Sequence, residues 1–339
     1  MRHLHKSNSL PLLAWLVRCL AVFLLLVNAA TAGDSLPSWN DTAPKQAIVR
    51  FVEQVSTPGS PAFVPLPERI ATFDTDGTLW SEQPSYAWDA FAFDRIKALA
   101  SQNPSWAKTQ PFKAVLEDDM ASFNAGGGAA RAAIMAAVYA GESMESITRM
   151  VTTWLATARN PKTGHLYTDM VYQPMQELLR YLRANGFKTY IVSGSGQEFL
   201  RPWSEKVFGI APEQVIGSVM NSTVEWRNGQ PVVLLLPTTN LINDNDGKVI
   251  GIDRFMGRRP IAAFGNSDGD LPMLHYATAG AGVRFGLLVH HTDAAREFAY
   301  DKDSPVGRLD KGLQQAQING WTVVDMKRDW KTVFVGEKN

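Results

Sequence analysis

The stretch ATFDTDGTLW, residues 71–80, decides how the rest of the chain is interpreted. In it a short apolar run ends in two aspartates, Asp74 and Asp76, which are followed at once by Gly77 and Thr78. Two carboxylates this close repel each other, and a simple turn needs only one aspartate and a glycine. The pair therefore predicts either a bound cation or a chemical task at this point of the chain.

The sequence around this stretch has the alternation of an α/β protein. Short buried strands are predicted at 69–73, 188–192 and 261–264, and helices are predicted at 43–55 and 197–208. Such alternation predicts a Rossmann-like, mostly parallel sheet covered by helices. Two further strands are predicted to form a hairpin around Arg227-Asn228-Gly229, within residues 214–236.

The composition changes between residues 85 and 169. Strand-like runs are absent there, and Ala, Met and Trp recur at helical spacing. One apolar stripe runs from Ile147 to Leu155, and Ser143 is its predicted helix start. We therefore predict a core in two parts, 33–84 and 170–339, with the helical stretch 85–169 inserted between them.

The first 32 residues have the pattern of a secretory signal peptide. Basic residues precede a short apolar run at 20–27, and Ala30-Thr31-Ala32 is a small-residue cleavage pattern. An uncleaved membrane anchor is the alternative, but the run is short for a membrane span. We expect cleavage, no stable membrane association afterwards, and secretion, with a bacterial periplasm as the natural compartment.

Charge and cysteine content exclude several classes of protein. Removing residues 1–32 takes away three basic and no acidic residues, so 307 residues remain and the formal charge falls from 0 to −3. This is no basic nucleic-acid binder. The single cysteine, Cys19, lies in the removed segment, so we expect no disulfide and no cysteine metal site in the mature chain.

Polar clusters follow three of the predicted strands, and a fourth lies between the last two. The clusters are DTDGT at 74–78, SGSG at 193–196, NDNDGK at 243–248 and GNSDGD at 265–270. Ligands in open α/β sheets bind at the carboxyl ends of the strands. We therefore expect the four clusters to meet at one edge of the sheet.

In order and spacing, these clusters resemble the four motifs of the haloacid dehalogenase superfamily. The run GNSDGDLPM is most similar to the phosphoserine-phosphatase-like branch, and the resemblance covers about 69–275. It implies a Mg²⁺-dependent phosphomonoester hydrolase acting on a small phosphorylated metabolite, with the inserted helices as a cap domain. The residue matching Asp74 is the nucleophile, which forms an aspartyl-phosphate, and the residue matching Asp76 is the general acid and base.

The resemblance also implies roles in the second and third clusters. Ser193 would donate a hydrogen bond to a phosphoryl oxygen, helped by the backbone N–H groups of Gly194 and Ser195. Lys248 would neutralise charge on the phosphoryl group and on the nucleophile. Each residue has an ordinary alternative, a helix cap for Ser193 and a solvated lysine after an Asp-Gly turn for Lys248.

The fourth cluster departs from the family pattern at its first metal position. Asn266 stands where an aspartate is usual, Asp270 fills the second position, and Asp268 lies between them. A Mg²⁺ ion would offset the repulsion between Asp74 and Asp76, because it prefers oxygen ligands. Either Asn266 binds it with Asp270 holding its waters, or Asp268 or Asp270 replaces Asn266, and the sequence leaves this open.

Substrate contacts are predicted from the stretch that leads into the insertion and from the insertion itself. Glu82 resembles the acid that contacts the substrate amine in phosphoserine phosphatases, and Arg131 is a candidate contact for a carboxylate or phosphate, or else a surface residue. The aromatic residues at 80–93 should mostly form cap core. Alternatively, one or two of them face the pocket and hold a cationic substrate such as phosphorylcholine.

Three rival interpretations remain at this stage. Phosphoryl transfer and dehalogenation are other chemistries of the same family, and the presence of Asp76 disfavours dehalogenation. A non-catalytic periplasmic binding protein on the same fold is the rival from a different class, and Asn266 keeps it open. The pair His290-His291 is interpreted as an ordinary loop pair before a helix starting near Thr292, because no other ligand lies at metal-binding spacing.

Overall fold

The computed structural model describes residues 34–336, so the expected signal peptide lies outside the described residues. A seven-stranded sheet has the order β4-β3-β2-β1-β5-β6-β7, and every neighbouring pair is parallel except β3 and β4. The strands are β1 (Ile70–Phe73), β2 (Lys188–Gly196), β3 (Val215–Arg227), β4 (Gln230–Leu241), β5 (Ala262–Gly265), β6 (Phe285–His290) and β7 (Thr322–Asp325). The predicted parallel α/β sheet is confirmed.

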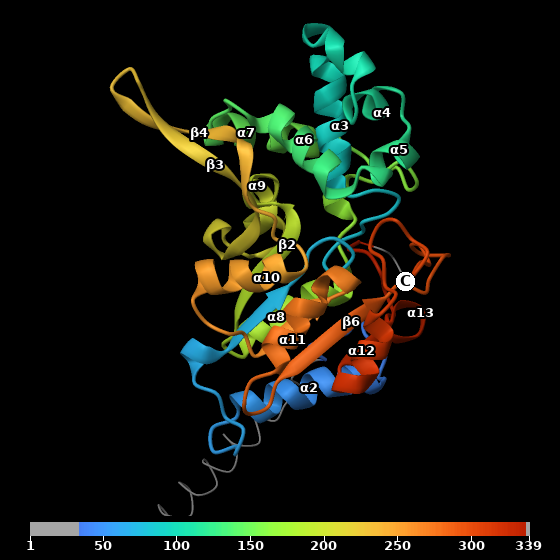
Figure 1. Ribbon diagram of the computed structural model, residues 1–339. Helices are drawn as coiled ribbons and strands as arrows, with labels where there is room; N and C mark the ends of the chain where they lie inside the picture. Colours follow the sequence, from blue (N-terminus) through green and yellow to red (C-terminus); the bar gives the residue numbers. More distant parts are fainter. Residues whose placement is uncertain (1–33, 337–339) are drawn as a thin grey trace, which may run out of the picture. The chain divides into compact units, whose positions relative to one another are not determined.

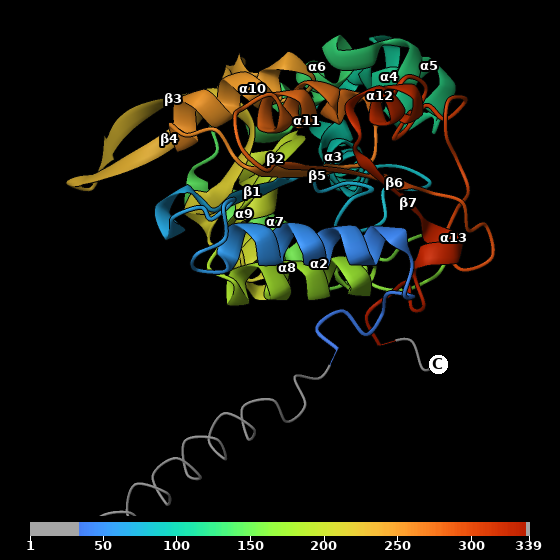
Figure 2. The same cartoon turned by 90° about the horizontal axis from the view of Figure 1, so that it is seen from below.

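Helices cover both faces of the parallel strands, as Figure 2 shows. Helices α2 (Ala43–Ser56) and α8 (Gln173–Ala184) lie on one face. Helices α10 (Asp246–Gly251), α11 (Leu271–Thr278) and α12 (Gly312–Asn319) lie on the other. The remaining core helices are α9 (Gln197–Phe208) and α13 (Met326–Asp329). Among the described residues, no helix has the length and apolar character needed to cross a membrane.

The central strand β1 is buried on both faces, which explains its continuous apolar sequence. Phe73 at its end stacks on Phe264 of β5, with ring centroids 4.4 Å apart. Because of this packing, β1 and β5 end side by side in the sheet, and their polar clusters begin at the same edge. The next residue continues the pairing, because the Asp74 N–H donates to the Phe264 carbonyl at 2.9 Å.

Five of the α-helices between β1 and β2 occupy the predicted insertion. They are α3 (Ala87–Leu99), α4 (Phe112–Leu116), α5 (Met120–Ala125), α6 (Gly127–Tyr139) and α7 (Met144–Leu155). Figure 1 shows α3 to α6 gathered together, away from α2 and α8. The predicted start of α7 is confirmed, because the Ser143 side chain accepts a hydrogen bond from the Ser146 N–H.

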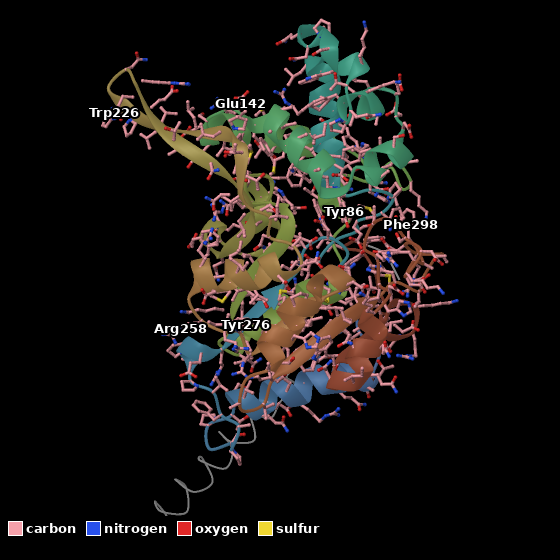
Figure 3. The ribbon with its side chains drawn as sticks, viewed as in Figure 1. Tyr86, Glu142, Trp226, Arg258, Tyr276 and Phe298 are labelled. Carbon is pink, nitrogen blue, oxygen red and sulfur yellow. The ribbon has the colours of Figure 1, made fainter. Side chains whose placement is uncertain are left out.

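Strands β3 and β4 form the predicted hairpin around a two-residue turn. Asn228 and Gly229 have φ values of 51° and 75°, which suit the mirror-image turns of tight hairpins. The hairpin projects away from the sheet in Figure 1, and Trp226 lies near its tip in Figure 3. Its base is attached to the insertion, because the Gly141 N–H donates to the Leu235 carbonyl at 2.8 Å.

The remaining short helical turns connect these elements. The 3-10 helices are η1 (Leu66–Glu68), η2 (Ala100–Gln102), η3 (Pro104–Lys108), η4 (Tyr167–Asp169), η5 (Pro212–Gln214) and η7 (Asp268–Asp270), and η6 (Ile252–Met256) is a π-helix. The helix predicted near Thr292 is wrong, because residues 291–311 contain no helix. There the Asp293 carboxylate accepts from the N–H groups of Ala295 and Arg296 and closes a single turn instead.

Candidate active site

A cavity of about 270 Å³ lies between the carboxyl ends of the central strands and the inserted helices. Tyr86, at the start of α3, lies between these two parts in Figure 3. The cavity is lined by Asp74, Asp76, Glu82, Tyr86, Trp88, Asp89, Gly128, Arg131, Ala132, Met135, Gly194, Ser195, Gly196, Ser218, Ile242, Asp244, Lys248, Ser267, Asp270 and Pro305. All four sequence clusters therefore contribute to one cavity.

Lys248 lies at the base of the cavity and joins three of the clusters. Its ammonium donates to Asp74 Oδ1 at 2.5 Å, to Asp270 Oδ1 at 2.6 Å and to the Val192 carbonyl at 2.9 Å. The side chain is only 2% exposed. The tight loop before it requires Gly247, since a Cβ there would lie 2.0 Å from the Ile242 carbonyl oxygen. Lys248 is therefore a buried site residue and not a solvated lysine.

The carboxylates at this base outnumber the cation. Burial and the charge of Asp270 raise the pKa of Asp74 well above its usual range, although Lys248 opposes this shift. Burial lowers the pKa of Lys248, but the charges of Asp270 and Asp74 more than compensate and raise it. Lys248 therefore stays charged, and it cannot balance Asp74, Asp76 and Asp270 together.

This donor set fits a hard divalent cation. Within residues 34–336, Asp74 Oδ2 accepts no hydrogen bond, and carboxylate oxygens are the ligands that Mg²⁺ prefers. No group of three or more His, Cys, Asp and Glu side chains in the same part of the chain is already arranged to hold a metal. Lys248 lies between Asp74 and Asp270, so metal binding would involve a shift of these side chains.

The Asp76 carboxylate is held by two side-chain donors. The Trp80 indole N–H donates to Oδ1 at 2.8 Å, and the Ser195 hydroxyl donates to Oδ2 at 2.7 Å. Burial raises the pKa of Asp76, while these two hydrogen bonds lower it. A carboxyl group with a raised pKa suits proton donation near neutral pH.

Ser195, rather than Ser193, presents its side chain to the cavity. Ser193 is fully buried, does not line the cavity, and accepts a hydrogen bond from the Ser195 N–H at 3.2 Å. Gly194 and Ser195 do line the cavity. A direct contact between Ser193 and a phosphoryl oxygen thus stays a prediction, and the Ser195 hydroxyl is a site group that the sequence analysis missed.

The amide and the two acids of the fourth cluster, Asn266, Asp268 and Asp270, lie in different surroundings. Asp270 lines the cavity, and its Oδ2 accepts from the N–H groups of Asn266 and Ser267 at 3.0 Å each. Asp268 faces another loop, where it accepts from the N–H groups of residues 310 to 312. Of the alternatives that the sequence left open, Asp270 is the one placed to contact a cavity ligand.

Asn266 connects the first loop to Glu82 and does not line the cavity. Its Oδ1 accepts from the Thr78 hydroxyl at 3.0 Å, and its Nδ2 donates to Glu82 Oε1 at 2.7 Å. The close approach depends on Gly77, whose φ is +74° and whose added Cβ would lie 2.1 Å from Asn266 Nδ2. Both ends of the Asn266 amide thus already have protein partners.

Glu82 is a buried acid on the cavity wall. Besides Asn266, the Tyr300 hydroxyl donates to its Oε1 at 2.7 Å. Burial raises the pKa of Glu82 well above its usual range, although the hydrogen bond from Tyr300 opposes the shift. The structure thus places Glu82 where a substrate could meet it, and the predicted amine contact stays a prediction.

Arg131 reaches the cavity wall from α6 and is not a free surface cation. Its guanidinium donates to Asp89 Oδ2 at 2.9 Å and to Asp89 Oδ1 at 3.3 Å. It also lies 5.5 Å from the centre of the Tyr86 ring. Its charge is therefore already balanced by Asp89 at the outer end of the cavity.

Two of the aromatic residues at 80–93 line the cavity, and the others pack away from it. Tyr86 and Trp88 line the cavity, while Phe91 and Phe93 do not. Phe91 is fully buried against Trp154, and Phe93 packs edge-on against Phe123. Trp80 is also fully buried and packs at a tilt of 30° against Trp203, with ring centroids 4.4 Å apart.

Three residues after β6, of which His291 and Glu297 are buried, also contact the site, and the sequence analysis missed them. His291 Nε2 lies 2.8 Å from the Gly77 carbonyl oxygen, and its Nδ1 lies 3.3 Å from Glu297 Oε2. The His291 ring stacks on Tyr300, which donates to Glu82. His291 is thus not an ordinary loop residue, and only its position next to a strand end could have hinted at this.

Comparison with known proteins agrees with this geometry. A family model described as haloacid dehalogenase-like hydrolase matches residues 71–275. No match was found among the curated proteins.

Several solved structures resemble the chain at low sequence identity. A protein of unknown function from Bordetella pertussis Tohama I is 18% identical, with a TM-score of 0.47 over 76% of this chain and 99% of that one. A functionally unknown protein from Anaerococcus prevotii DSM 20548 is 14% identical, with a TM-score of 0.50 over 77% and 89%. A phosphoserine phosphohydrolase-like protein from Francisella tularensis is 17% identical, with a TM-score of 0.37 over 65% and 87%.

Similarity at these identities concerns the fold alone. The family match is stronger, because it spans more than half of the 339 residues and contains all four motifs that meet at the cavity. The chain belongs to the haloacid dehalogenase-like hydrolase family.

Proposed function

We propose that this protein is a Mg²⁺-dependent phosphatase of the phosphoserine-phosphatase-like branch, which hydrolyses a small phosphomonoester through an aspartyl-phosphate on Asp74. The observation that carries the proposal is the meeting of Asp74, Lys248 and Asp270 at the base of one cavity. Asp76 lies in the same wall with both carboxylate oxygens hydrogen-bonded. A nucleophile, a cation and a proton donor are thus available to one phosphoryl group.

In the first half of the reaction, a carboxylate oxygen of Asp74 attacks phosphorus. The bond between phosphorus and the leaving oxygen breaks, and Asp76 gives its proton to that oxygen, so that an alcohol departs. The Lys248 ammonium lowers the energy of the negative charge that develops on the phosphoryl oxygens. Ser195 and Trp80 hold the Asp76 carboxylate in a fixed orientation during the transfer.

In the second half, water attacks the phosphorus of the acyl phosphate. Asp76, now ionised, takes a proton from this water, and the bond between phosphorus and Asp74 breaks. Inorganic phosphate leaves, and both aspartates return to their starting states. When bound, Mg²⁺ would add positive charge at the phosphoryl oxygens.

Asp74, Asp76 and Asp270 are the carboxylates that this cavity would offer to the metal, since all three line it and belong to the first or fourth cluster. Asn266, outside the cavity lining, stays a predicted ligand of the same ion. Asp76, Asp270 and Asn266 each already make hydrogen bonds through both polar side-chain atoms, so metal binding there would involve an additional contact or an exchange of partners.

The cavity supports a small metabolite as substrate. Its volume of about 270 Å³ lies near the lower end of the range for ligand pockets. A phosphoryl group and a short leaving group would fill it. The inserted helices supply its outer wall, which supports the interpretation of residues 85–169 as a cap that excludes water.

A cationic leaving group, as in phosphorylcholine, is a second candidate. Tyr86 and Trp88 line the cavity, and Asp89 and Asp244 line it as well. Aromatic faces and carboxylates both attract quaternary ammonium groups. A comparison of phosphorylcholine, phosphoserine and simple alkyl phosphates would test this, and equal kcat/KM values on all of them would exclude a cation site.

Substitution of the nucleophile is the first test. Asp74→Asn should abolish hydrolysis of p-nitrophenyl phosphate in Mg²⁺ while leaving the circular dichroism spectrum unchanged, because the amide cannot attack phosphorus. Asp253→Asn, at an exposed position outside the cavity, is the matched control and should keep wild-type activity. Turnover by Asp74→Asn would remove Asp74 from its proposed role.

Two further outcomes distinguish the rivals. EDTA should stop turnover by the wild-type protein, and added Mg²⁺ should restore it. A wild-type protein that hydrolyses no phosphomonoester with any divalent metal would favour the non-catalytic binding protein. Transfer of the phosphoryl group to an added alcohol, in preference to water, would favour a phosphotransferase. Export to the periplasm stays a prediction from residues 1–32, and a mature N-terminus at Gly33 in the periplasmic fraction would support it.

A further inference from the structure

The segment after β6 surrounds the first loop with buried polar groups that the proposed reaction does not use. His291 and Glu297 are each 3% exposed, although neither lines the cavity. They lie more than 200 residues from the first loop in sequence and contact it through Gly77 and Ser81. A buried ionisable pair at this position calls for a physical reason, because its burial is costly.

Glu297 is held in place by four polar contacts. Oε1 accepts from the Ser81 hydroxyl at 2.6 Å and from the Tyr172 hydroxyl at 3.2 Å. Oε2 accepts from the Phe298 N–H at 2.8 Å and faces His291 Nδ1 at 3.3 Å. Because three of these contacts come from O–H or N–H donors, the carboxyl group has a fixed position beside the His291 ring. Burial raises the pKa of Glu297, but the His291 contact and these hydrogen bonds outweigh it and lower the pKa.

The partners of His291 then fix the orientation of its ring. Nε2 lies 2.8 Å from the Gly77 carbonyl oxygen, which only accepts, so Nε2 carries a proton and donates to this carbonyl. Nδ1 lies 3.3 Å from Glu297 Oε2. The ring also stacks on Tyr300, with ring centroids 4.4 Å apart.

We propose that His291 is a positioning residue, whose Nε2–H, oriented by Glu297, fixes the first loop through the Gly77 carbonyl. Gly77 directly follows Asp76 and precedes Thr78, which donates to Asn266. The Gly77 N–H is held from the other side by the Trp80 carbonyl at 2.8 Å. The hydrogen bond from His291 therefore restricts the turn that carries both aspartates. The inference rests on the proposed function for its kinetic consequence but not for the hydrogen bond itself.

The hydrogen bond is tested without turnover. In wild-type protein labelled with ¹⁵N at histidine, Nε2 of His291 should have the chemical shift of a protonated ring nitrogen. An Nε2 of His291 that carries no proton would overturn the inference. Because this measurement needs no substrate, its failure is separable from failure of the proposed phosphatase activity.

Two amide variants test the role in catalysis. In His291→Gln the side-chain amide can take the place of Nε2 and donate to the Gly77 carbonyl, whereas in His291→Asn it reaches only the position of Nδ1. His291→Asn should lower kcat by roughly 10- to 100-fold, the range for leaving one buried hydrogen-bonding group unpaired, with KM changed by less than about threefold. His291→Gln should recover at least about a tenth of the wild-type kcat.

A merely structural role predicts a different result. Both variants would then lose stability together, and kcat per folded molecule would stay at the wild-type value, which would overturn the proposal. His290→Asn and His290→Gln are matched controls, since the neighbouring His290 lies half-buried at the end of β6 and pairs in register with Asp325, outside the cavity. These controls should keep the wild-type kcat.

Discussion

At the scale of single residues, the base of the cavity depends on charge more than on packing. Lys248 is the cation in contact with Asp74 and Asp270, and all three side chains are nearly or fully buried. Breaking a buried ion pair from one side leaves an uncompensated charge in a poorly solvated place. The stability of the site without ligands therefore depends strongly on this one ammonium group.

Lys248→Met should destabilise the protein by about 3–5 kcal/mol at pH 7, the range for removing one partner of a buried pair. Urea unfolding followed by circular dichroism would measure this loss. Lys113→Met is the control, because Lys113 is 45% exposed and its ion pair with Glu117 is long at 3.9 Å. That exposed pair should contribute less than about 1 kcal/mol. Equal losses of stability in the two variants would show that burial does not increase the contribution of the Lys248 ion pairs to stability.

The sequence predicted the site best where chemistry directly follows a strand. Asp74, Asp76 and Asp270 lie beside the ends of β1 and β5, and the position of such residues follows from the topology of a parallel sheet. Which serine faces the cavity did not follow, because the β2–β3 pairing shifts register between Val192 and Gly196. Such an irregularity leaves no trace in a period-two pattern.

Residues in irregular loops were not predictable in the same way. His291, Glu297 and Tyr300 belong to a segment without helix or strand periodicity, and their contacts with Gly77 and Glu82 join positions over 200 residues apart. The sequence does not show that this loop folds back over the first loop. Asn266 was singled out as an unusual residue, yet only the structure shows that its amide is bound to Thr78 and Glu82.

At the scale of elements, the hairpin β3–β4 has a buried base and an exposed tip. Leu234 and Leu235 are 4% and 3% exposed, whereas Val224 and Trp226 near the tip are 57% and 73% exposed. The base pairs with the insertion, because the Leu235 N–H donates to the Glu142 carbonyl at 3.1 Å. The two halves of this element should therefore contribute very differently to stability.

Replacing residues 224–233 by Asn-Gly should leave the fold and its thermal midpoint almost unchanged. Thr223 and Leu234 are cross-strand partners in the hairpin. They lie an even number of positions along the chain from Arg227 and Gln230, the pair that flanks the natural turn, so both pairs have the same orientation relative to the sheet. The natural turn type therefore fits the shorter hairpin. Leu235→Asp in the intact hairpin is the contrasting change, and burying its charge should lower the midpoint by several degrees. A large loss on shortening would show that the tip has contacts of its own.

At the scale of the whole molecule, the fold brings acidic groups from distant segments into one cavity and places few cationic side chains beside them. The sheet supplies Asp74, Asp76 and Asp270, the first loop adds Glu82, and the insertion adds Asp89; burial raises the pKa values of Glu82 and Asp89. Such an arrangement stores unfavourable energy in the free protein, and binding of a divalent cation would release it. Stability, metal binding and pH should therefore be linked.

The sign of this linkage can be worked out for Asp74. Its folded-state pKa is raised by burial and by Asp270, so the folded state binds a proton more tightly than the unfolded chain does. Stability contributed by this group is therefore present at low pH and falls as pH rises from about 4, the unfolded value, through the raised folded value. Asp74→Asn removes the titrating group, so its stability should lack this decline.

In EDTA, Asp74→Asn should thus become more stable relative to the wild type between pH 5 and pH 8, as measured by thermal midpoints in a pH series. Adding Mg²⁺ should reverse the order at pH 8, because ligand binding at a hundredfold excess over Kd adds about 2.7 kcal/mol to the protein that keeps the binding carboxylate. Asp253→Asn, exposed and outside the cavity, should follow the wild type throughout. The stability difference between wild type and Asp74→Asn could instead stay constant across the series, with and without Mg²⁺. That result would show that Asp74 is neither the buried group that titrates nor a ligand of the metal.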